Sequence, residues 1–416
     1  MIDRREIIER AGELSLRPEV IEKDYVLGWV LAGIANHAEI SSAWSFKGGT
    51  CLKKVHFETY RFSEDLDFTL DSADQVDASF LRRVFTEITA WIYEQTGIEF
   101  LADQLRFDVY ANKRGHPSVE GRLYYRGPLA PRGSLPAIRL DLTADERMVL
   151  PPELAAIDHP YADAPTAGIR VRAYAFVEVF AEKVRALGDR GSPRDLYDVV
   201  NLFRRDEARE RAGEVLATLR EKCAFKSLPV PSARTLEAHR EDLEADWASM
   251  LSHQLPELPP FASFWNVLPE FFAWLEGRTA TARLAPHPRA GGELVRPSAG
   301  GFLALGIAGR PIETIRFAAA NLLRVDLEYR DESGRRSTRR IEPYSLRRSE
   351  AGDVLLHAER ADGGGHRSYR VDRIIAARVT SDAFVPRWRI ELSPGRSLIA
   401  ASSRSAPGAS SPRRRR

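Results

Sequence analysis

The sequence predicts an α+β protein in which a mixed catalytic part is followed by a helical part and a small C-terminal β-domain. Charged and apolar residues alternate over residues 65–70, which is typical of a half-buried strand. Residues 174–276 instead follow mainly helical periodicity, and short strand-like runs separated by turn residues come after residue 300. A chain of 416 residues exceeds one ordinary core, so two or three domains are expected.

The composition is that of a globular protein, with 44% hydrophobic and 29% charged residues. No apolar run approaches the roughly 18 residues of a membrane span, and the charged N-terminus does not resemble a signal peptide. The two cysteines, Cys51 and Cys223, predict a reducing cytoplasm. Neither CxxC nor HExxH occurs, which argues against a zinc site.

The net charge of +2 hides an asymmetry along the chain. Residues 291–416 contain 24 Arg, no Lys and 14 acidic residues, which gives 24 − 14 = +10. Residues 1–290 contain 37 basic and 45 acidic residues, which gives 37 − 45 = −8. Two interpretations stay open: the basic end meets an anion such as nucleic acid, or it is a solvated arginine-rich surface.

The predicted elements follow one another in a regular order. Residues 3–40 are expected to be helical, with Ser15 as a cap and Pro18 in the first turn. The apolar stripe from Leu81 to Ile92 predicts a core-facing helix. Further expected elements are strands at 44–47, 98–110, 119–126 and 137–143, and a short helix at 50–56.

The domain organisation follows from these elements and from composition. Residues 277–300 are rich in Gly, Pro, Ala and Arg, which is typical of a linker, and the basic tail is expected to be disordered. The predicted units are a catalytic domain at 1–165, a helical domain completing the cleft at 166–276, a linker at 277–300, a small β-barrel at 301–395 and a tail at 396–416.

Two carboxylates on one predicted strand suggest a metal site. Asp65 and Asp67 are two residues apart, so they share a face of the strand while Leu66 and Phe68 point into the core. Adjacent carboxylates repel each other, which favours a cation between them. Magnesium prefers a few carboxylate oxygens together with substrate phosphates.

Gly48 and Gly49 supply the other half of the predicted site. Without Cβ atoms their backbone can approach a phosphate closely, and Thr50 adds a hydroxyl group. Asp141 alternates with apolar residues on a predicted neighbouring strand, and it is expected to project toward the other two carboxylates as general base or metal ligand. Such a site suits nucleotidyl transfer, which needs mostly positioning and charge neutralisation.

The motifs KGGTCLKK and RFSEDLDF resemble the AbiEii/AbiGii family of nucleotidyltransferase toxins of bacterial type IV toxin–antitoxin, or abortive-infection, systems. EKDYVLGWVL, AEKVRAL and RDLYDV add to a resemblance over about residues 20–205. It implies a DNA-polymerase-β-like catalytic fold, NTP as substrate, and Mg²⁺ or Mn²⁺ held by Asp65 and Asp67. The nucleotide-binding residues that it implies are Lys47, Gly48, Gly49, Thr50, Arg61, Ser63, Lys183, Asp195 and Asp198.

The same resemblance implies a bacterial cytoplasmic enzyme of phage defence, an antitoxin encoded nearby, and an RNA acceptor, typically the 3′ end of tRNA. For Lys183 the alternative is a solvated helix residue, and for Asp195 it is a cap or a partner of Arg194. Two other functions stay open: a nucleotide- or nucleic-acid-sensing regulator with a degenerate transferase body, and a transferase acting on a small molecule.

Residues 317–387 resemble a WYL domain, an Sm/SH3-like β-barrel of bacterial regulators. The matching runs are VDLEYRDESGRRSTRRIEPYSL and SYRVDRIIAARVTSDAFVPR, while Val-Leu-Leu at 354–356 replaces the usual Trp-Tyr-Leu. Tyr369, Arg370 and Arg373 are the candidate ligand site, because arginine forks bind phosphate oxygens in pairs. The effector would be a nucleotide or nucleic acid; the alternative is a module that only packs against the catalytic body.

Overall fold

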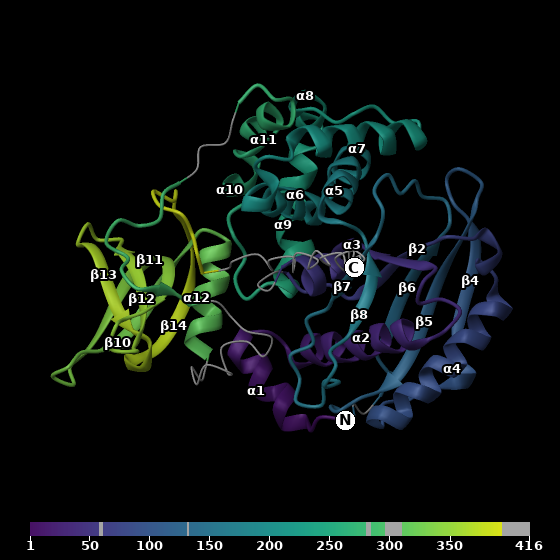
Figure 1. Cartoon of the computed structure of the whole chain (residues 1–416), viewed down its shortest axis with the longest axis horizontal. Coiled ribbons are helices and arrows are strands. Elements are labelled where there is room, and N and C mark those ends of the chain that lie inside the picture. Colours follow the sequence, from purple (N-terminus) through teal and green to yellow (C-terminus); the bar gives the residue numbers. More distant parts are fainter. Residues whose placement is uncertain (58–60, 131–132, 280–283, 296–309, 393–416) are drawn as a thin grey trace, which may run out of the picture.

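The chain folds into a mixed sheet with covering helices, a helical layer and a C-terminal antiparallel sheet (Figure 1). The predicted α+β class is therefore confirmed. The tail predicted at 396–416 lies outside the described residues. The computed structural model describes residues 1–57, 61–130, 133–279, 284–295 and 310–392.

An eight-stranded mixed sheet forms the base of the N-terminal part. Its strands are β1 (Trp44–Lys47), β2 (Asp65–Leu70), β3 (Glu99–Phe100), β4 (Arg106–Ala111), β5 (Pro117–Arg126), β6 (Ala137–Thr143), β7 (Glu153–Ala156) and β8 (Arg170–Ala173). Their order is β3-β5-β6-β2-β1-β8-β7, and β4 also pairs with β5. β2 is parallel to β6 and antiparallel to β1. The first residues of β2 and β6 therefore lie beside the last residues of β1, at the same end of the strands.

Two long helices, α2 (Pro18–Asn36) and α4 (Ala78–Thr96), cover the apolar face of this sheet (Figure 1). Asp77 caps α4 by accepting a hydrogen bond from a backbone amide of the first turn. Phe85 of α4 is fully buried, and its ring centroid lies 5.3 Å from that of Phe107 on β4. The apolar alternation of the strands thus builds one continuous core with α4.

Helices form a second layer on the opposite face of the sheet (Figure 1). They are α5 (Phe176–Arg190), α6 (Pro193–Phe203), α7 (Ala212–Phe225), α8 (Ala233–Glu237), α9 (Arg240–Leu251), α10 (Ala262–Trp265) and α11 (Leu268–Leu275). Aromatic residues fill their core: Phe180 of α5 stacks on Trp274 of α11, with centroids 5.8 Å apart. The polar face of the sheet is thus the one on the side of this helical layer.

The C-terminal part consists of one helix and an antiparallel sheet. Its elements are β9 (Glu293–Leu294), α12 (Arg310–Ala320), β10 (Leu323–Arg330), β11 (Arg336–Arg348), β12 (Val354–Arg360), β13 (Gly365–Arg370) and β14 (Ile374–Ala383). The order is β13-β12-β11-β10-β14, and β9 pairs with β11. The antiparallel β-domain is confirmed, whereas its closure into a barrel stays a prediction.

The C-terminal part contacts the N-terminal part through α12. This helix packs against α1 (Arg4–Leu14). At its end, Asn321 accepts a 2.7 Å hydrogen bond from the hydroxyl group of Tyr197 on α6, and both side chains are buried. A second link is the ion pair between Arg389 and Asp206.

Several local predictions differ from the structure. Ser15 caps the end of α1, in the left-handed conformation with φ +54°, and does not start α2, which begins after Arg17. The strand expected at 98–110 is interrupted by a 3₁₀ turn at Ala102–Gln104. β8 follows residue 165 yet belongs to the sheet, and β9 lies inside the expected linker. For β8 and β9, long-range strand pairing outweighs local composition.

Within the described part of the chain, no helix is both long and apolar enough to span a membrane.

Substitution of Phe85 by alanine is expected to lower the free energy of unfolding by about 3–5 kcal/mol, because it leaves a cavity between α4 and the sheet. Tyr93→Ala, in the same helix at a side chain that is 58% exposed, is the matched control and should change it by less than about 0.5 kcal/mol. Urea denaturation measures both. Equal effects of the two substitutions would contradict this packing.

Candidate active site

Strand register brings the three predicted carboxylates together. Asp67 on β2 pairs directly with Asp141 on parallel β6 and with Lys47 on antiparallel β1. Directly paired residues point to the same face of a sheet, and so does Asp65, two residues before Asp67. Leu66 points to the opposite face and is fully buried. The carboxylates therefore lie on the polar face, near the end of the strands at which β1 stops.

Gly48 lies against this row in a way that requires glycine. Its φ is +79°, and a Cβ atom there would come within 1.9 Å of a carboxylate oxygen of Asp67. At Gly49 a Cβ atom would lie 2.7 Å from Nη2 of Arg61 and 2.9 Å from Oγ of Ser63. The glycine pair thus lets the backbone turn tightly between Asp67 on one side and Arg61 and Ser63 on the other.

Thr50, in the helical turn α3 (Gly48–Cys51), is buried, and its hydroxyl group donates a hydrogen bond to the backbone oxygen of Asp65. This bond ties the turn after β1 to the start of β2. In the structure Thr50 therefore positions the backbone that carries Asp65. A direct contact of its hydroxyl group with a triphosphate stays a prediction.

The carboxylates are not fully neutralised by the protein. Burial, together with the charges of Asp141 and Asp65, raises the pKa of Asp67 to about 6 against the opposing charge of Lys47. Burial and nearby acidic groups likewise raise the pKa of Asp141. The charge of Lys47 is shared between this row and Glu146, because its Nζ atom lies 3.4 Å from a carboxylate oxygen of Glu146. Additional positive charge would therefore stabilise this row.

The donor set suits magnesium bound together with a nucleotide. The described residues contain no group of three or more His, Cys, Asp or Glu side chains arranged to hold a metal ion by themselves. Magnesium commonly takes one or two carboxylates and completes its shell with phosphate oxygens and water. Asp65, Asp67 and Asp141 fit that chemistry, since their mutual repulsion is what a divalent cation relieves.

A buried ion-pair network closes the other side of the site. Asp198 is fully buried; it accepts hydrogen bonds of 2.7 and 2.8 Å from Arg61, and its carboxylate lies 2.7 Å from Nζ of Lys183. Asp195 pairs with Lys183 at 3.3 Å and with Arg190 at 2.6 Å. Although burial opposes ionisation, Arg61 and Lys183 hold the pKa of Asp198 well below its usual value.

Burial and pairing place both residues inside the protein. Lys183 is not a solvated lysine, since only 7% of it is exposed, and Asp195 pairs with Lys183 and Arg190 instead of with Arg194. The network joins α5, α6 and the segment before β2. Because Arg61 also lies against Gly49, the network supports the glycine turn directly.

Arg194 is a site residue that the sequence did not single out. Its Nε atom is buried without a hydrogen-bond partner, and no ion pair holds it within the described residues. Burial and the charge of Arg61 lower its pKa, while Asp65 and Glu64 act in the opposite direction. The motif RDLYDV pointed to its two aspartates. Helical spacing nevertheless places Arg194 one turn before Asp198, on the same side of α6.

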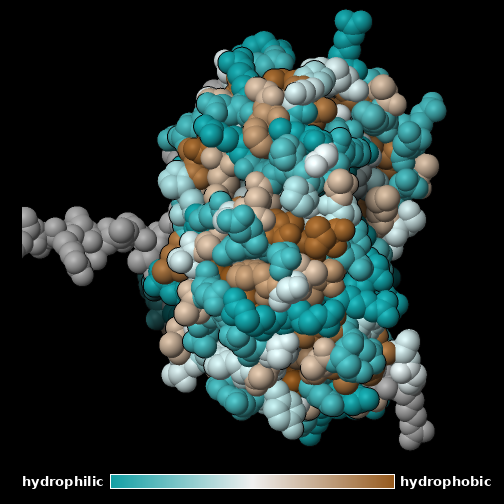
Figure 2. All heavy atoms as spheres, turned by 90° about the vertical axis from the view of Figure 1, so that its right-hand side faces the viewer, coloured by the Kyte–Doolittle hydropathy of each residue, from teal (hydrophilic) through white to brown (hydrophobic). Residues whose placement is uncertain are grey.

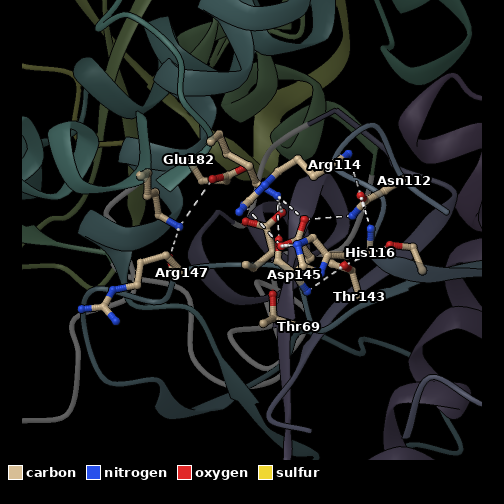
Figure 3. A network of polar contacts seen from close by, with 12 residues as sticks. Thr69, Asn112, Arg114, His116, Thr143, Asp145, Arg147 and Glu182 are labelled. Atoms are coloured by element: carbon tan, nitrogen blue, oxygen red, sulfur yellow. Dashed lines mark hydrogen bonds and ion pairs between the residues drawn. The ribbon is translucent and has the colours of Figure 1, made fainter. Parts of the chain in front are cut away.

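Polar contacts also fasten the end of β6 to the helical layer (Figure 3). The Asp145 carboxylate accepts a hydrogen bond from Asn112, and the Asp145 backbone oxygen accepts one of 2.6 Å from Lys226, the residue after α7. Lys222 donates to the backbone oxygen of Arg147 and pairs with Glu178 of α5 at 2.7 Å. The helix that carries Lys183 is thereby held over the strand that carries Asp141.

In the C-terminal sheet, the three predicted ligand residues lie near one another. β13 ends at Arg370, and the 3₁₀ turn that follows brings Arg373 near Tyr329, as Arg370 also is. The ring of Tyr329 contacts that of Tyr369 edge-on, with ring centroids 5.2 Å apart. The turn provides the convergence that strict strand alternation would prevent. Both arginines are engaged: Arg370 pairs with Asp353 and Asp372, and Arg373 with Glu332.

The class defined by this fold and site is that of nucleotidyltransferases, and comparison with known families agrees. Residues 29–276, more than half of the chain, match the family described as nucleotidyl transferase AbiEii toxin, type IV TA system. The chain belongs to the AbiEii family. Residues 311–379 match the WYL domain.

Solved structures show weaker similarity. MenT4, a nucleotidyltransferase toxin from Mycobacterium tuberculosis H37Rv, is 18% identical, with a TM-score of 0.42 over 66% of this chain and 90% of MenT4. A putative nucleotidyltransferase from Helicobacter pylori is 15% identical, with a TM-score of 0.39 over 63% and 95% of the two chains. Proteasome accessory factor B/C of Arthrobacter aurescens is 13% identical, with a TM-score of 0.18 over 90% and 74%. A search of functionally curated proteins found no significant match.

Asp198→Asn is expected to lower the free energy of unfolding at pH 7 by about 3–5 kcal/mol, because two buried cations lose their charged partner. Asp189→Asn is the control: Asp189 pairs with Arg185 on the same helix, at a more exposed position, and its loss should cost less than about 1 kcal/mol. Urea denaturation would measure both variants. A cost below 1 kcal/mol for Asp198→Asn would show that the network does not organise the site.

Proposed function

We propose that the protein is a Mg²⁺- or Mn²⁺-dependent nucleotidyltransferase that moves a nucleoside monophosphate from an NTP to an acceptor. The observation that carries this proposal is the row formed by Asp67 and Asp141 in direct register, with Asp65 on the same face and Gly48 turned tightly against it. A site degraded to a sensor would have little reason to retain three mutually repelling carboxylates. That row favours the enzyme over the degenerate regulator.

Each part of the site has a role in the proposed reaction. The backbone of Gly48 and Gly49 would bind the triphosphate. Arg61 and Lys183 would add positive charge next to this glycine turn, and Arg194 would add positive charge near Asp65. Asp141 would accept the proton of the attacking hydroxyl group while that oxygen bonds to the α-phosphorus and the bond to pyrophosphate breaks. When bound, the divalent cation supplies neutralisation of the phosphate charge.

The acceptor proposed from family membership is RNA, with the 3′ end of tRNA as the specific candidate, and the setting is a toxin of bacterial phage defence with an antitoxin partner. A small-molecule acceptor is the second candidate. The two are distinguished by incubating the protein with each labelled NTP, Mg²⁺ and either total RNA or a small-molecule extract. Label that becomes RNase-sensitive supports the RNA acceptor.

We propose a regulatory role for the C-terminal domain, with a nucleotide or nucleic acid as effector at Tyr369, Arg370 and Arg373. The buried bond from Tyr197 to Asn321 supports this role, because Tyr197 precedes Asp198 on α6. A shift of α12 would therefore act next to the ion-pair network. Equal transfer rates of the wild type and an Arg370→Glu/Arg373→Glu variant over a salt series would argue against the role.

Asp67→Asn and Asp65→Asn are each expected to reduce transfer at least about 100-fold, since each removes a charge that holds the cation. The fold should be retained, because either substitution relieves like-charge repulsion. Transfer of labelled NTP to RNA and circular dichroism are measured on the same samples. The control is Asp71→Asn, just after the same strand, which removes a partly exposed carboxylate paired with Arg172. Wild-type activity in either site variant would exclude the proposed metal site.

A further inference from the structure

A row of arginines lies beside the carboxylates on the polar face of the sheet. Asp65 on β2 pairs in register with Arg139 on β6, Arg139 pairs with Arg122 on β5, and Arg122 pairs with Arg106 on β4. Residues paired in this way point to the same face. With strands about 4.8 Å apart, the three arginines span about 10 Å from β6 to β4, and Arg106 at the edge of the sheet lies about 14 Å from Asp65.

These arginines are largely free of protein partners. Arg139 and Arg106 are exposed, and neither forms an ion pair or a side-chain hydrogen bond with the described residues. Arg122 approaches Glu120 only to 4.0 Å. This contrasts with the ligand-site arginines of the C-terminal sheet, such as Arg370, which are paired. The row is therefore a positively charged surface available to a polyanion.

Aromatic side chains and a pocket accompany the row. Tyr124 lies two residues after Arg122 on β5 and shares its face, and Tyr110, on β4, is 40% exposed. A pocket of about 560 Å³ is lined by Leu101, Gln104, Arg106, Tyr124, Arg126 and residues 133–135. The side of the molecule on which β4 forms the sheet edge is mostly hydrophilic, with hydrophobic residues gathered near its centre (Figure 2). Charged grooves interleaved with aromatic residues are typical of single-strand binding.

The position of the row relative to the glycine turn indicates what binds there. Gly48 and Gly49 follow β1, on one side of β2, whereas the arginines lie on β6, β5 and β4, on its other side. A nucleotide at the glycine turn and a polyanion on the row would thus approach Asp67 and Asp141 from opposite directions. That is the arrangement an in-line transfer requires.

We propose that Arg139, Arg122 and Arg106 bind the phosphate backbone of a single-stranded nucleic-acid acceptor and deliver its terminal hydroxyl group to Asp141. A base near that end occupies the pocket beside Tyr124. This inference rests on the proposed transferase function and adds the surface that holds its acceptor. A single strand fits better than a duplex, because only an unpaired base can enter the pocket and stack on tyrosine.

The test uses the full chain and a 5′-labelled single-stranded RNA of about 10 nucleotides, a length within the usual site sizes for such proteins. Arg106→Glu/Arg122→Glu should weaken RNA binding at least tenfold. It should also reduce the slope of log K against the logarithm of the salt concentration by about two. NTP affinity, measured by calorimetry, should stay unchanged. The matched control is Arg82→Glu, an exposed arginine of α4 on the other side of the sheet, which should bind RNA as the wild type does.

Tyr124→Ala provides an independent readout, because loss of stacking should weaken RNA binding without changing the salt dependence. Equal RNA affinity of the wild type and the double variant overturns the proposal, and so does tighter binding of a duplex of the same sequence. A wild type that binds no NTP would instead overturn the proposed transferase function. The RNA titrations would still decide whether the row is a nucleic-acid surface.

Discussion

The buried carboxylate of Asp198 is the constraint on which the arrangement of the site depends. Burying a charge costs several kcal/mol unless partners compensate it, and here Arg61 and Lys183 do so from two different parts of the chain. The segment before β2, α5 and α6 must therefore meet at one point. Once they meet, Arg61 lies against Gly49, and the glycine turn is held against the row of carboxylates.

Two kinds of charge cluster thus coexist within one site. Around Asp198 the buried carboxylate is paired with Arg61 and Lys183, which hold its pKa below the usual value. Around Asp67 the acidic and basic groups are not matched, and burial beside Asp141 raises the pKa. Strong pKa perturbation without internal compensation is typical of sites that act on a charged ligand. The two clusters thus differ in how far the protein itself compensates their buried charges.

The net charge of +10 over residues 291–416 does not show which arginines are free to bind a ligand. In the C-terminal sheet many arginines pair with carboxylates of the same domain, as Arg340 does with Asp326 and Asp382. By contrast, Arg106 and Arg139 of the acidic N-terminal part lie on the polar face of the sheet and have no such partners in the part of the chain that the structure describes. Net charge over a long segment therefore says little about which arginines are available to a ligand.

Sequence alone determined the parts that depend on near neighbours. Period-two alternation identified β2 and β6, the stripe from Leu81 to Ile92 identified α4, and ordered motifs identified the transferase family and the WYL domain. These signals are local, because side-chain direction follows backbone period. They also picked out Asp65, Asp67 and Asp141 before any pairing was known.

Tertiary structure decided everything that depends on strand register and on contacts between distant segments. Only the pairing of β2 with β6 shows that Asp67 faces Asp141. Only the docking of α6 shows that Asp195 pairs with Lys183, and that the Arg194 Nε atom has no hydrogen-bond partner among the described residues. The physical reason is that a pairing shift of one residue reverses every side chain on a strand. Local sequence does not encode that choice.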